Sequence, residues 1–396
     1  MPKFILLTQQ GKFELAIKND QENVLDVLKR SGIPQSMVSL LVKHGSDNTY
    51  SLASVTTRFD ELQPGDEVLA RITRNIDTAS FIPKLAIRKN DNLVTEWIES
   101  VEGKDGVISN FLVQLDRTQA EESVIDAVRN FFKEFPDFGA KKMVVGASGG
   151  GDSNALLTAL KASVPPENII VVTLVGFPDW TEASAKRATI LCEQYGLKQI
   201  VVSADEVARN CGFKVFLNEA VRSFKEAFSP RELIFLSTFA IQQNLTLKAR
   251  EMGINDIILG ANREDVLGEA LYYISRGLLP SPFPVRSFDE YRFGFPLWLV
   301  PKKVIDGVHP KMSVENYEER DPGSTHWRDR FYFLAHLLED SGIGGDLLML
   351  KGLSELSREN KKWLGATDES GVFMAGAASD IGKGNWASWL KTVTKN

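Results

Sequence analysis

Residues 148–153 are a run of serine, glycine and aspartate that is suited to binding an anion. The apolar residues 143–145 before the run are typical of a buried strand, and leucines at helical spacing within 156–160 follow it. A glycine-rich turn between a strand and a helix lets the backbone approach phosphate closely, and the helix dipole favours negative charge there. The pattern therefore predicts a phosphate site at this turn.

Three side chains add chemistry to the backbone of the turn. Ser148 and Ser153 offer hydroxyl donors, and Asp152 is placed to hold Mg²⁺ against phosphate oxygens. The alternative is an ordinary serine–glycine turn that binds no ligand.

The order of residues separates this turn from two common phosphate motifs. No lysine follows the glycines as in G-x-x-x-x-G-K-S/T, and the glycines do not fit G-x-G-x-x-G. The run resembles the SGGxDS signature of the PP-loop ATP pyrophosphatases, which cleave ATP between the α and β phosphates and use AMP to activate a substrate oxygen. The resemblance implies ATP and Mg²⁺ as cofactors, with the nucleotide bound by Ala147, Ser148, Gly149, Gly150, Gly151, Asp152 and Ser153.

A second segment of this kind follows the apolar residues 256–259. Gly260, Asn262 and Asp265 lie in register with the G-x-H/N-x-D-D-x-x-x-T segment of tRNA-lysidine synthetases and tRNA 2-thiolating PP-loop enzymes, which this segment resembles. Glu264 stands where that motif has its first aspartate. The resemblance implies that Gly260 and Asn262 contact the nucleotide.

Asp265 is the predicted partner of Asp152. Mg²⁺ keeps most of its waters and takes one or two carboxylates, which these two aspartates can supply. Asp265 is also the better candidate to relay a proton from an incoming nucleophile. The alternative is an acid that only stabilises a helix N-terminus through the dipole, and for Glu269 this alternative is favoured.

Residues 296–305 resemble the P-L … K-x-x-I stretch of the same enzymes. Release of pyrophosphate requires cations over the β and γ phosphates, and Lys302 or Arg263 can provide one. The alternative for Lys302 and Lys303 is a solvated turn after Pro301. The predicted catalytic residues are Asp152, Asp265 and Lys302.

Apolar segments alternate with helical ones around the first motif. Strands are expected within 143–145, 167–176, 198–205 and 256–262, and helices over 118–135, 181–195 and 230–252. This alternation is typical of an α/β fold, a parallel sheet with helices on both faces. Residues 117–300 are therefore expected to form a domain of the HUP/PP-loop type, with the nucleotide at the strand ends.

Three further regions flank this domain. Residues 1–76 have the pattern strand, strand, helix, strand, strand and a last strand after a Pro-Gly turn, which resembles the β-grasp domains. Such a unit implies a docking or substrate-positioning module, and the alternative is a structural appendage. Residues 77–116 are interpreted as a connector in which 82–89 and 106–115 have strand character and 95–102 has helical character. Residues 301–396 are expected to form a mostly helical substrate-side region.

Composition limits the remaining options. The chain has 396 residues, 43% of them apolar, and no apolar run approaches the ~20 residues that span a bilayer, so we expect a cytoplasmic protein with no membrane partner. A net charge of −6 argues against indiscriminate nucleic-acid binding. Cys192 and Cys211 are too few for an iron–sulfur or cysteine–zinc site and are expected to be buried thiols.

The leading hypothesis is ATP-dependent adenylation of a carbonyl oxygen on a tRNA nucleobase, followed by replacement with sulfur or an amine. A sulfur-donor protein is then an expected partner, because the chain has no cysteine cluster. One alternative is the same chemistry on a small metabolite, to form a thioamide, amide or thio-base. The other alternative is a non-catalytic ATP- or AMP-binding scaffold. The sequence leaves the oligomeric state open.

Overall fold

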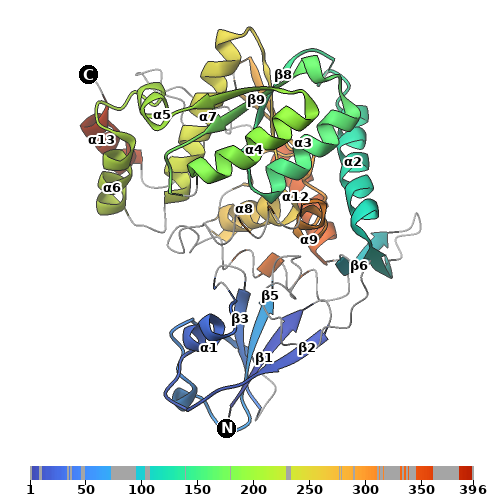
Figure 1. The fold of residues 1–396 in the computed structure, drawn as a ribbon, viewed down its shortest axis with the longest axis vertical. Helices are drawn as coiled ribbons and strands as arrows, with labels where there is room; N and C mark the ends of the chain where they lie inside the picture. The colour runs from blue at the N-terminus through green and yellow to red at the C-terminus, as the bar shows by residue number, and fades with distance from the viewer. Residues whose placement is uncertain are drawn as a thin grey trace.

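The computed structural model comprises two sheet-containing units and a short β-ribbon (Figure 1). The N-terminal unit is small, and the larger unit contains both motifs. The structure describes residues 2–8, 11–33, 35, 38–45, 50–72, 95–102, 108–138, 140–178, 180–228, 233–275, 277, 279–288, 290–309, 312, 315, 331, 334, 335, 338, 345–359 and 383–394.

A six-stranded sheet forms the centre of the larger unit, in the order β10-β9-β8-β11-β13-β12. All neighbouring pairs are parallel except β13 with the edge strand β12. The α/β fold with a mostly parallel sheet is therefore as predicted. The strands are β8 (Met143–Gly146), β9 (Ile169–Leu174), β10 (Lys198–Val202), β11 (Asp256–Leu259), β12 (Val285–Phe288) and β13 (Tyr291–Gly294).

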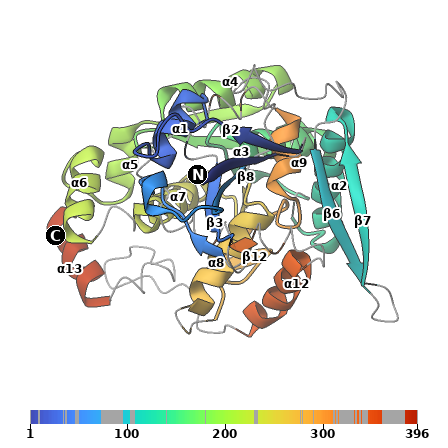
Figure 2. The same cartoon turned by 90° about the horizontal axis from the view of Figure 1, so that it is seen from below.

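Helices cover both faces of this sheet (Figure 2). Alternate strand residues explain the two cores, because Val144 and Ile170 face one of them while Val145 and Val171 face the other. Packed on the first face are α5 (Ala204–Asn210), α6 (Leu217–Ala227), α7 (Leu233–Glu251) and α13 (Lys383–Val393). Packed on the second face are α2 (Arg117–Glu134), α3 (Gly151–Ser163), α4 (Glu182–Tyr195) and α9 (Lys302–Val308).

Side-chain caps fix the starts of two predicted helices. The Asp116 side chain accepts a hydrogen bond from the backbone of Gln119 at the start of α2. The Thr181 side chain does the same for Ser184 at the start of α4. Each cap satisfies a backbone N–H that the helix leaves without an internal partner, so the helices begin within one residue of the predicted positions.

The order of the strands creates a switch point beside β8. From β8 the chain proceeds to β9 and β10 on one side, and it then returns to the other side of β8 as β11. The register pairs Gly146 at the end of β8 with Leu259 at the end of β11. Ligands of open α/β sheets bind in the crevice outside the carboxyl ends of such neighbouring strands, and both sequence motifs follow these two strands.

The N-terminal unit contains the predicted succession of elements. Its sheet has the order β2-β1-β5-β3-β4, and α1 (Val24–Arg30) packs on one face through Val27 and Leu28 against Phe4 and Val68. The strands are β1 (Lys3–Thr8), β2 (Gly11–Leu15), β3 (Val38–Lys43), β4 (Tyr50–Leu52) and β5 (Glu67–Ile72).

The prediction of helical character for residues 95–102 is wrong. This segment is strand β6 (Thr95–Glu102), which pairs antiparallel with β7 (Ile108–Leu115) along its whole length. Thr95, Trp97 and Ile98 are residues that favour strands, and pairing with β7 satisfies the backbone. The expected strand over 82–89 lies outside the described residues.

Two C-terminal helices pack against the larger unit. Helix α12 (Gly345–Arg358) packs against α8 (Arg263–Ser275) through Leu350 and Leu353. Trp386 and Trp389 of α13 enter the core beside α6 and α7. Within the described ranges, every helix is too short or not apolar enough to cross a membrane.

Candidate functional site

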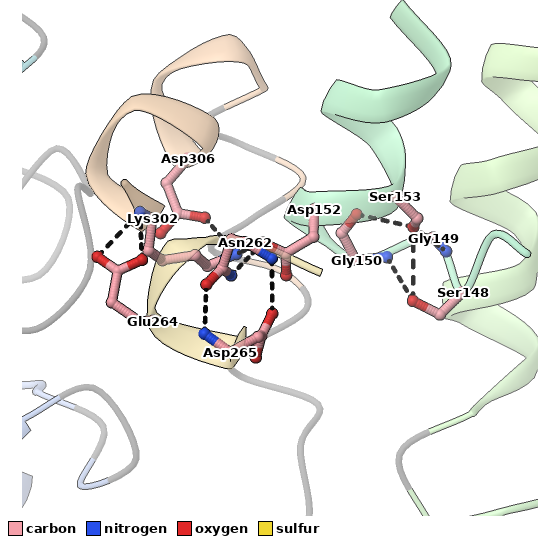
Figure 3. Close-up of polar contacts among 10 residues, drawn as sticks. All are labelled: Ser148, Gly149, Gly150, Asp152, Ser153, Asn262, Glu264, Asp265, Lys302 and Asp306. Atoms are coloured by element: carbon pink, nitrogen blue, oxygen red, sulfur yellow. Dashed lines mark hydrogen bonds and ion pairs between the residues drawn. The ribbon is translucent and has the colours of Figure 1, made fainter. Parts of the chain in front are cut away.

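The turn after β8 is closed by its own serine side chains (Figure 3). The backbone N–H of Gly149 donates to Oγ of Ser153 at 3.0 Å, and this hydroxyl donates to the carbonyl of Gly150 at 3.1 Å. The N–H of Gly150 lies 3.4 Å from Oγ of Ser148. These contacts hold the backbone in a compact loop at the start of α3.

Helix α3 begins without a side-chain cap. Gly150 is its N-cap residue and makes no capping hydrogen bond, whereas Asn23, Asp116, Thr181 and Ser203 cap α1, α2, α4 and α5. A helix start needs acceptors for its first N–H groups, and a glycine cannot supply one. An anion from outside the chain suits this helix start, because the dipole also favours negative charge there.

Both the backbone conformation and the surroundings of Gly149 require a glycine at this position. Its φ is +78°, and a Cβ at this position would lie 1.8 Å from the carbonyl oxygen of Ser184 in α4. Its own carbonyl accepts from Nε of Arg187 at 3.1 Å and from Nδ2 of Asn154 at 3.0 Å. Arg187 and Asn154 are thus parts of the site that were not predicted from the sequence. The signal that could have identified them is a polar residue at a helical position that faces the core.

The turn after β11, in contrast, has a side-chain cap. Oδ1 of Asn262 accepts from the N–H of Asp265 at 2.8 Å, and Oδ2 of Asp265 accepts from the N–H of Asn262 at 3.2 Å. This reciprocal pair is a capping box at the start of α8. The Asn262 amide also donates to Oδ1 of Asp152 at 2.8 Å, so it connects the two turns. Gly260 lies close to the backbone of Asp152, since a Cβ there would be 3.1 Å from its carbonyl.

Lys302 links α9 to both turns (Figure 3). Its ammonium lies 2.8 Å from Oδ1 of Asp152 and 3.1 Å from Oδ1 of Asp306. Its backbone N–H donates to the Glu264 carboxylate at 2.9 Å. The side chain is 2% exposed and Lys303 is also buried, so the alternative of a solvated turn is wrong for both lysines.

Two carboxylates contact the Lys302 ammonium, those of Asp152 and Asp306, while Glu264 binds the backbone N–H of Lys302 and Asp265 binds Asn262. Asp152 is partly exposed, whereas Glu264 and Asp306 are buried. No group of three or more possible metal ligands occurs among the described residues. A pair such as Asp152 and Asp265, both bonded to Asn262, fits the one or two carboxylates that Mg²⁺ takes.

Arg263 and Glu269 are engaged in structural ion pairs. Arg263 lies 2.9 Å from Asp346 of α12 and donates to the carbonyl of Leu299 at 2.8 Å. Glu269 pairs with Arg286 at 2.8 Å. The structure therefore places Lys302, and not Arg263, beside Asp152.

The far end of α9 contacts α3. Nε2 of His309 lies 2.8 Å from Oγ1 of Thr158, which is also 3.0 Å from the hydroxyl of Tyr195. Burial, together with the charge of Arg117, lowers the pKa of His309 to about 4. This histidine is therefore neutral at physiological pH.

The two cysteines lie in the two different cores, on opposite faces of the sheet. Burial raises the pKa of the Cys192 thiol to about 11, and burial raises the pKa of Cys211 far above its usual range. Both thiols are therefore protonated, and they are too far apart in the fold to share one cluster.

Comparisons with known proteins give matches among solved structures. Family models give no match, and neither do curated protein sequences. The chain is similar to the U34-tRNA thiolase NcsA from Methanococcus maripaludis with its 4Fe-4S cluster, at 16% identity over 63% of this chain and 83% of that chain, with a TM-score of 0.47.

Two further structures are synthetases. The NH3-dependent NAD synthetase from Campylobacter jejuni is 14% identical over 62% of this chain and 95% of its own, with a TM-score of 0.34. The NMN synthetase from Francisella tularensis is 15% identical over 64% and 99%, with a TM-score of 0.36. At identities this low the chemistry has to come from the site itself.

Proposed function

We propose that the protein is an AMP-forming enzyme that binds MgATP where α3 and α8 begin. A carbonyl oxygen of the substrate attacks the α-phosphorus of ATP, and the bond from this phosphorus to the β-phosphate bridge breaks to release pyrophosphate. A sulfur or amine nucleophile then adds to the activated carbon and displaces AMP. The observation that carries the proposal is the buried Lys302 ammonium, 2.8 Å from Asp152 at the start of an uncapped helix.

The first turn supports the binding of the phosphates. Its backbone donors, the Ser148 hydroxyl and the positive end of the α3 dipole all favour the negative charge that builds up on departing pyrophosphate. Lys302 adds one full positive charge beside this turn. Because the lysine is buried, its interaction with phosphate is weakly screened by water.

The carboxylates at the second turn support the binding of Mg²⁺. When bound, Mg²⁺ supplies a Lewis acid that neutralises charge on the phosphate oxygens. We assign Asp152 and Asp265 as its protein ligands, with Asn262 orienting both of them. Oδ2 of Asp265 also accepts from the N–H of Asn262 and so stabilises the start of α8. We therefore assign Oδ1 of Asp265 to the ion.

The nucleophile is assigned to another molecule. Cys192 and Cys211 are buried and their raised pKa values keep them as thiols, so neither is suited to carry sulfur to a substrate. The nucleophile is therefore an amine, or sulfur that a separate donor protein delivers to this cytoplasmic enzyme.

A tRNA nucleobase is the first proposed substrate, and a small metabolite is the second. The second-motif residues Asn262 and Asp265 favour the tRNA substrate, through the resemblance to tRNA-modifying enzymes. The net charge of −6 favours the metabolite, because a phosphate backbone needs a basic surface. Residues 1–76 are assigned to docking the substrate, and 301–396 to completing its side of the site.

Labelled ATP tests the reaction class directly. The protein is incubated with ATP carrying ³²P at the α-phosphate, together with total RNA or with a small-metabolite extract. The proposal expects labelled AMP and an equal amount of pyrophosphate, whereas labelled ADP would contradict it. Treatment with RNase removes the activity if the substrate is tRNA and leaves it unchanged if the substrate is a metabolite.

The variant Asp152→Asn separates an enzyme from a nucleotide-binding scaffold. We expect pyrophosphate release to fall by about a hundredfold or more, because the charge that orients metal and lysine is lost. Nucleotide binding should fall by less than about tenfold, since the backbone donors remain. Asp205→Asn is the matched control, because Asp205 also lies in the first turn of a helix that follows a sheet strand, at the start of capped α5. Equal activity of wild type and Asp152→Asn would support the scaffold.

A further inference from the structure

The Lys302 ammonium lies between two carboxylates of different exposure. Asp152 on α3 has a side chain that is 28% exposed, and Asp306 on α9 is fully buried. Asp306 follows Lys302 by four residues on the same helix, so these two side chains form an intrahelical pair. The contact with Asp152, in contrast, joins two separate helices.

One oxygen of Asp152 accepts two hydrogen bonds from the other parts of the site. Its Oδ1 accepts from the Lys302 ammonium and from the Asn262 amide, both at 2.8 Å. A divalent cation that binds Asp152 therefore meets the ammonium at close range, and like charges repel. A buried ammonium that lost its carboxylate partner would be strongly destabilised. Asp306 on α9 provides a second carboxylate within 3.1 Å of the ammonium.

We propose that Asp306 is a positioning residue that retains the Lys302 ammonium when Asp152 binds a divalent cation. This inference rests on the proposed function, in which Asp152 holds Mg²⁺ beside the phosphates. Before the cation binds, Lys302 neutralises Asp152. After it binds, the ammonium stays beside Asp306 at the same place in the crevice, and its charge is directed to the phosphate.

The inference is tested by binding of Mn²⁺, which suits the same oxygen ligands as Mg²⁺. Free Mn²⁺ is measured by electron paramagnetic resonance, with the full chain and with α,β-methylene-ATP present or absent. The variants are Lys302→Met, Asp306→Asn and the double variant. Asp256→Asn is the matched control, because Asp256 is also buried and ion-paired, with Arg292, but begins β11 at the opposite end of that strand.

Lys302→Met should bind Mn²⁺ about tenfold more tightly than wild type, because the cation no longer competes with an ammonium for Asp152. Asp306→Asn should bind it about fivefold more weakly, because Lys302 then loses the carboxylate that shares its ammonium with Asp152. In the Lys302→Met background, Asp306→Asn should change the affinity by less than about twofold. Asp256→Asn should leave the affinity of wild type unchanged.

An equal effect of Asp306→Asn in both backgrounds would overturn the inference, because it would show that Asp306 acts only through its long-range charge. If Asp306→Asn does not fold, Asp306→Glu provides the same comparison, since it moves the carboxylate by one methylene. A wild-type chain that binds neither Mn²⁺ nor the analogue would overturn the proposed function together with the inference. Binding of both with additive substitutions would overturn the inference alone.

Discussion

The two turns that follow β8 and β11 have the same place in the fold and opposite chemistry. Each joins a strand of the central sheet to a helix, and their strands are neighbours. The turn before α3 has a glycine N-cap and no side-chain cap, whereas the turn before α8 has a complete Asn262–Asp265 capping box. One helix start therefore has no side-chain acceptor for its first N–H groups, and the other is capped by Asn262 and Asp265.

Helix α9 lies against both turns and has different contacts at its two ends. Lys302 at its start bridges the turns through Asp152 and Glu264. His309 at its end contacts Thr158 in the body of α3. Opposite charges meet here because the starts of α3, α8 and α9 lie together, with Lys302 of α9 in contact with Asp152 of α3 and Glu264 of α8.

The largest expected effect comes from adding a side chain in the turn before α3. In Gly149→Ala the new Cβ would lie 1.8 Å from a backbone carbonyl of Ser184, so the turn or α4 has to move. We expect the free energy of unfolding to fall by about 3 kcal/mol or more, and nucleotide binding to be lost. Chemical denaturation and nucleotide titration measure the two effects.

Gly196→Ala is the control for this substitution. Gly196 also has a positive φ, +66°, but nothing lies within 4 Å of its expected Cβ. The variant should lose only about 1 kcal/mol and bind nucleotide normally. Similar losses in both variants would mean that backbone conformation, and not the close approach to α4, shapes the turn.

The next effect concerns the contact between α9 and α3. The folded pKa of His309, about 4, lies below the usual 6.5, so the unfolded chain binds the extra proton first as the pH falls. Stability is therefore fully present above pH 6.5 and is lost as the pH falls towards 4, by about 3 kcal/mol for this group.

His309→Gln removes this titration and should flatten the acid limb of the stability curve by the same amount. Urea unfolding of both proteins between pH 7 and 4 measures the difference, because all other titrating groups are common to them. Parallel curves would show that His309 is solvated and does not hold α9 against α3.

The smallest effect comes from removing the side-chain cap at the start of α8. Asn262→Ala should cost about 1 kcal/mol of stability through loss of the capping box. It should also weaken nucleotide binding by about fivefold, because the amide no longer orients Asp152. Asn23→Ala provides a close control, since Asn23 forms the same box with Asp26 at the start of α1. A loss of nucleotide binding in both variants would argue against a specific role for Asn262.

The residues of both motifs were predictable because local sequence determines a strand, a turn and a helix start. The run from Ser148 to Ser153 and the register of Asn262 with Asp265 both depend on neighbours within a few residues. The same is true of the starts of α2 and α4, where Asp116 and Thr181 provide the caps.

Contacts between distant segments were harder to predict. Lys302 and Lys303 follow a proline and carry charge, so a solvated turn was a reasonable alternative, yet both are buried. The strand at 95–102 depended on pairing with β7, and the role of Arg187 depended on the packing of α4 against Gly149. Asp306 gave no signal at all, since an aspartate four residues after a lysine is common on exposed helices.

The type of fold and the two motifs follow from local sequence, because apolar periodicity, glycine turns and capping residues act over short range. Which charges meet depends on the packing of distant segments. Asp152, Asn262 and Lys302 lie far apart in the chain and are brought together by the order of the strands. Burial then gives the lysine its partners, because an ammonium removed from water has to be paired.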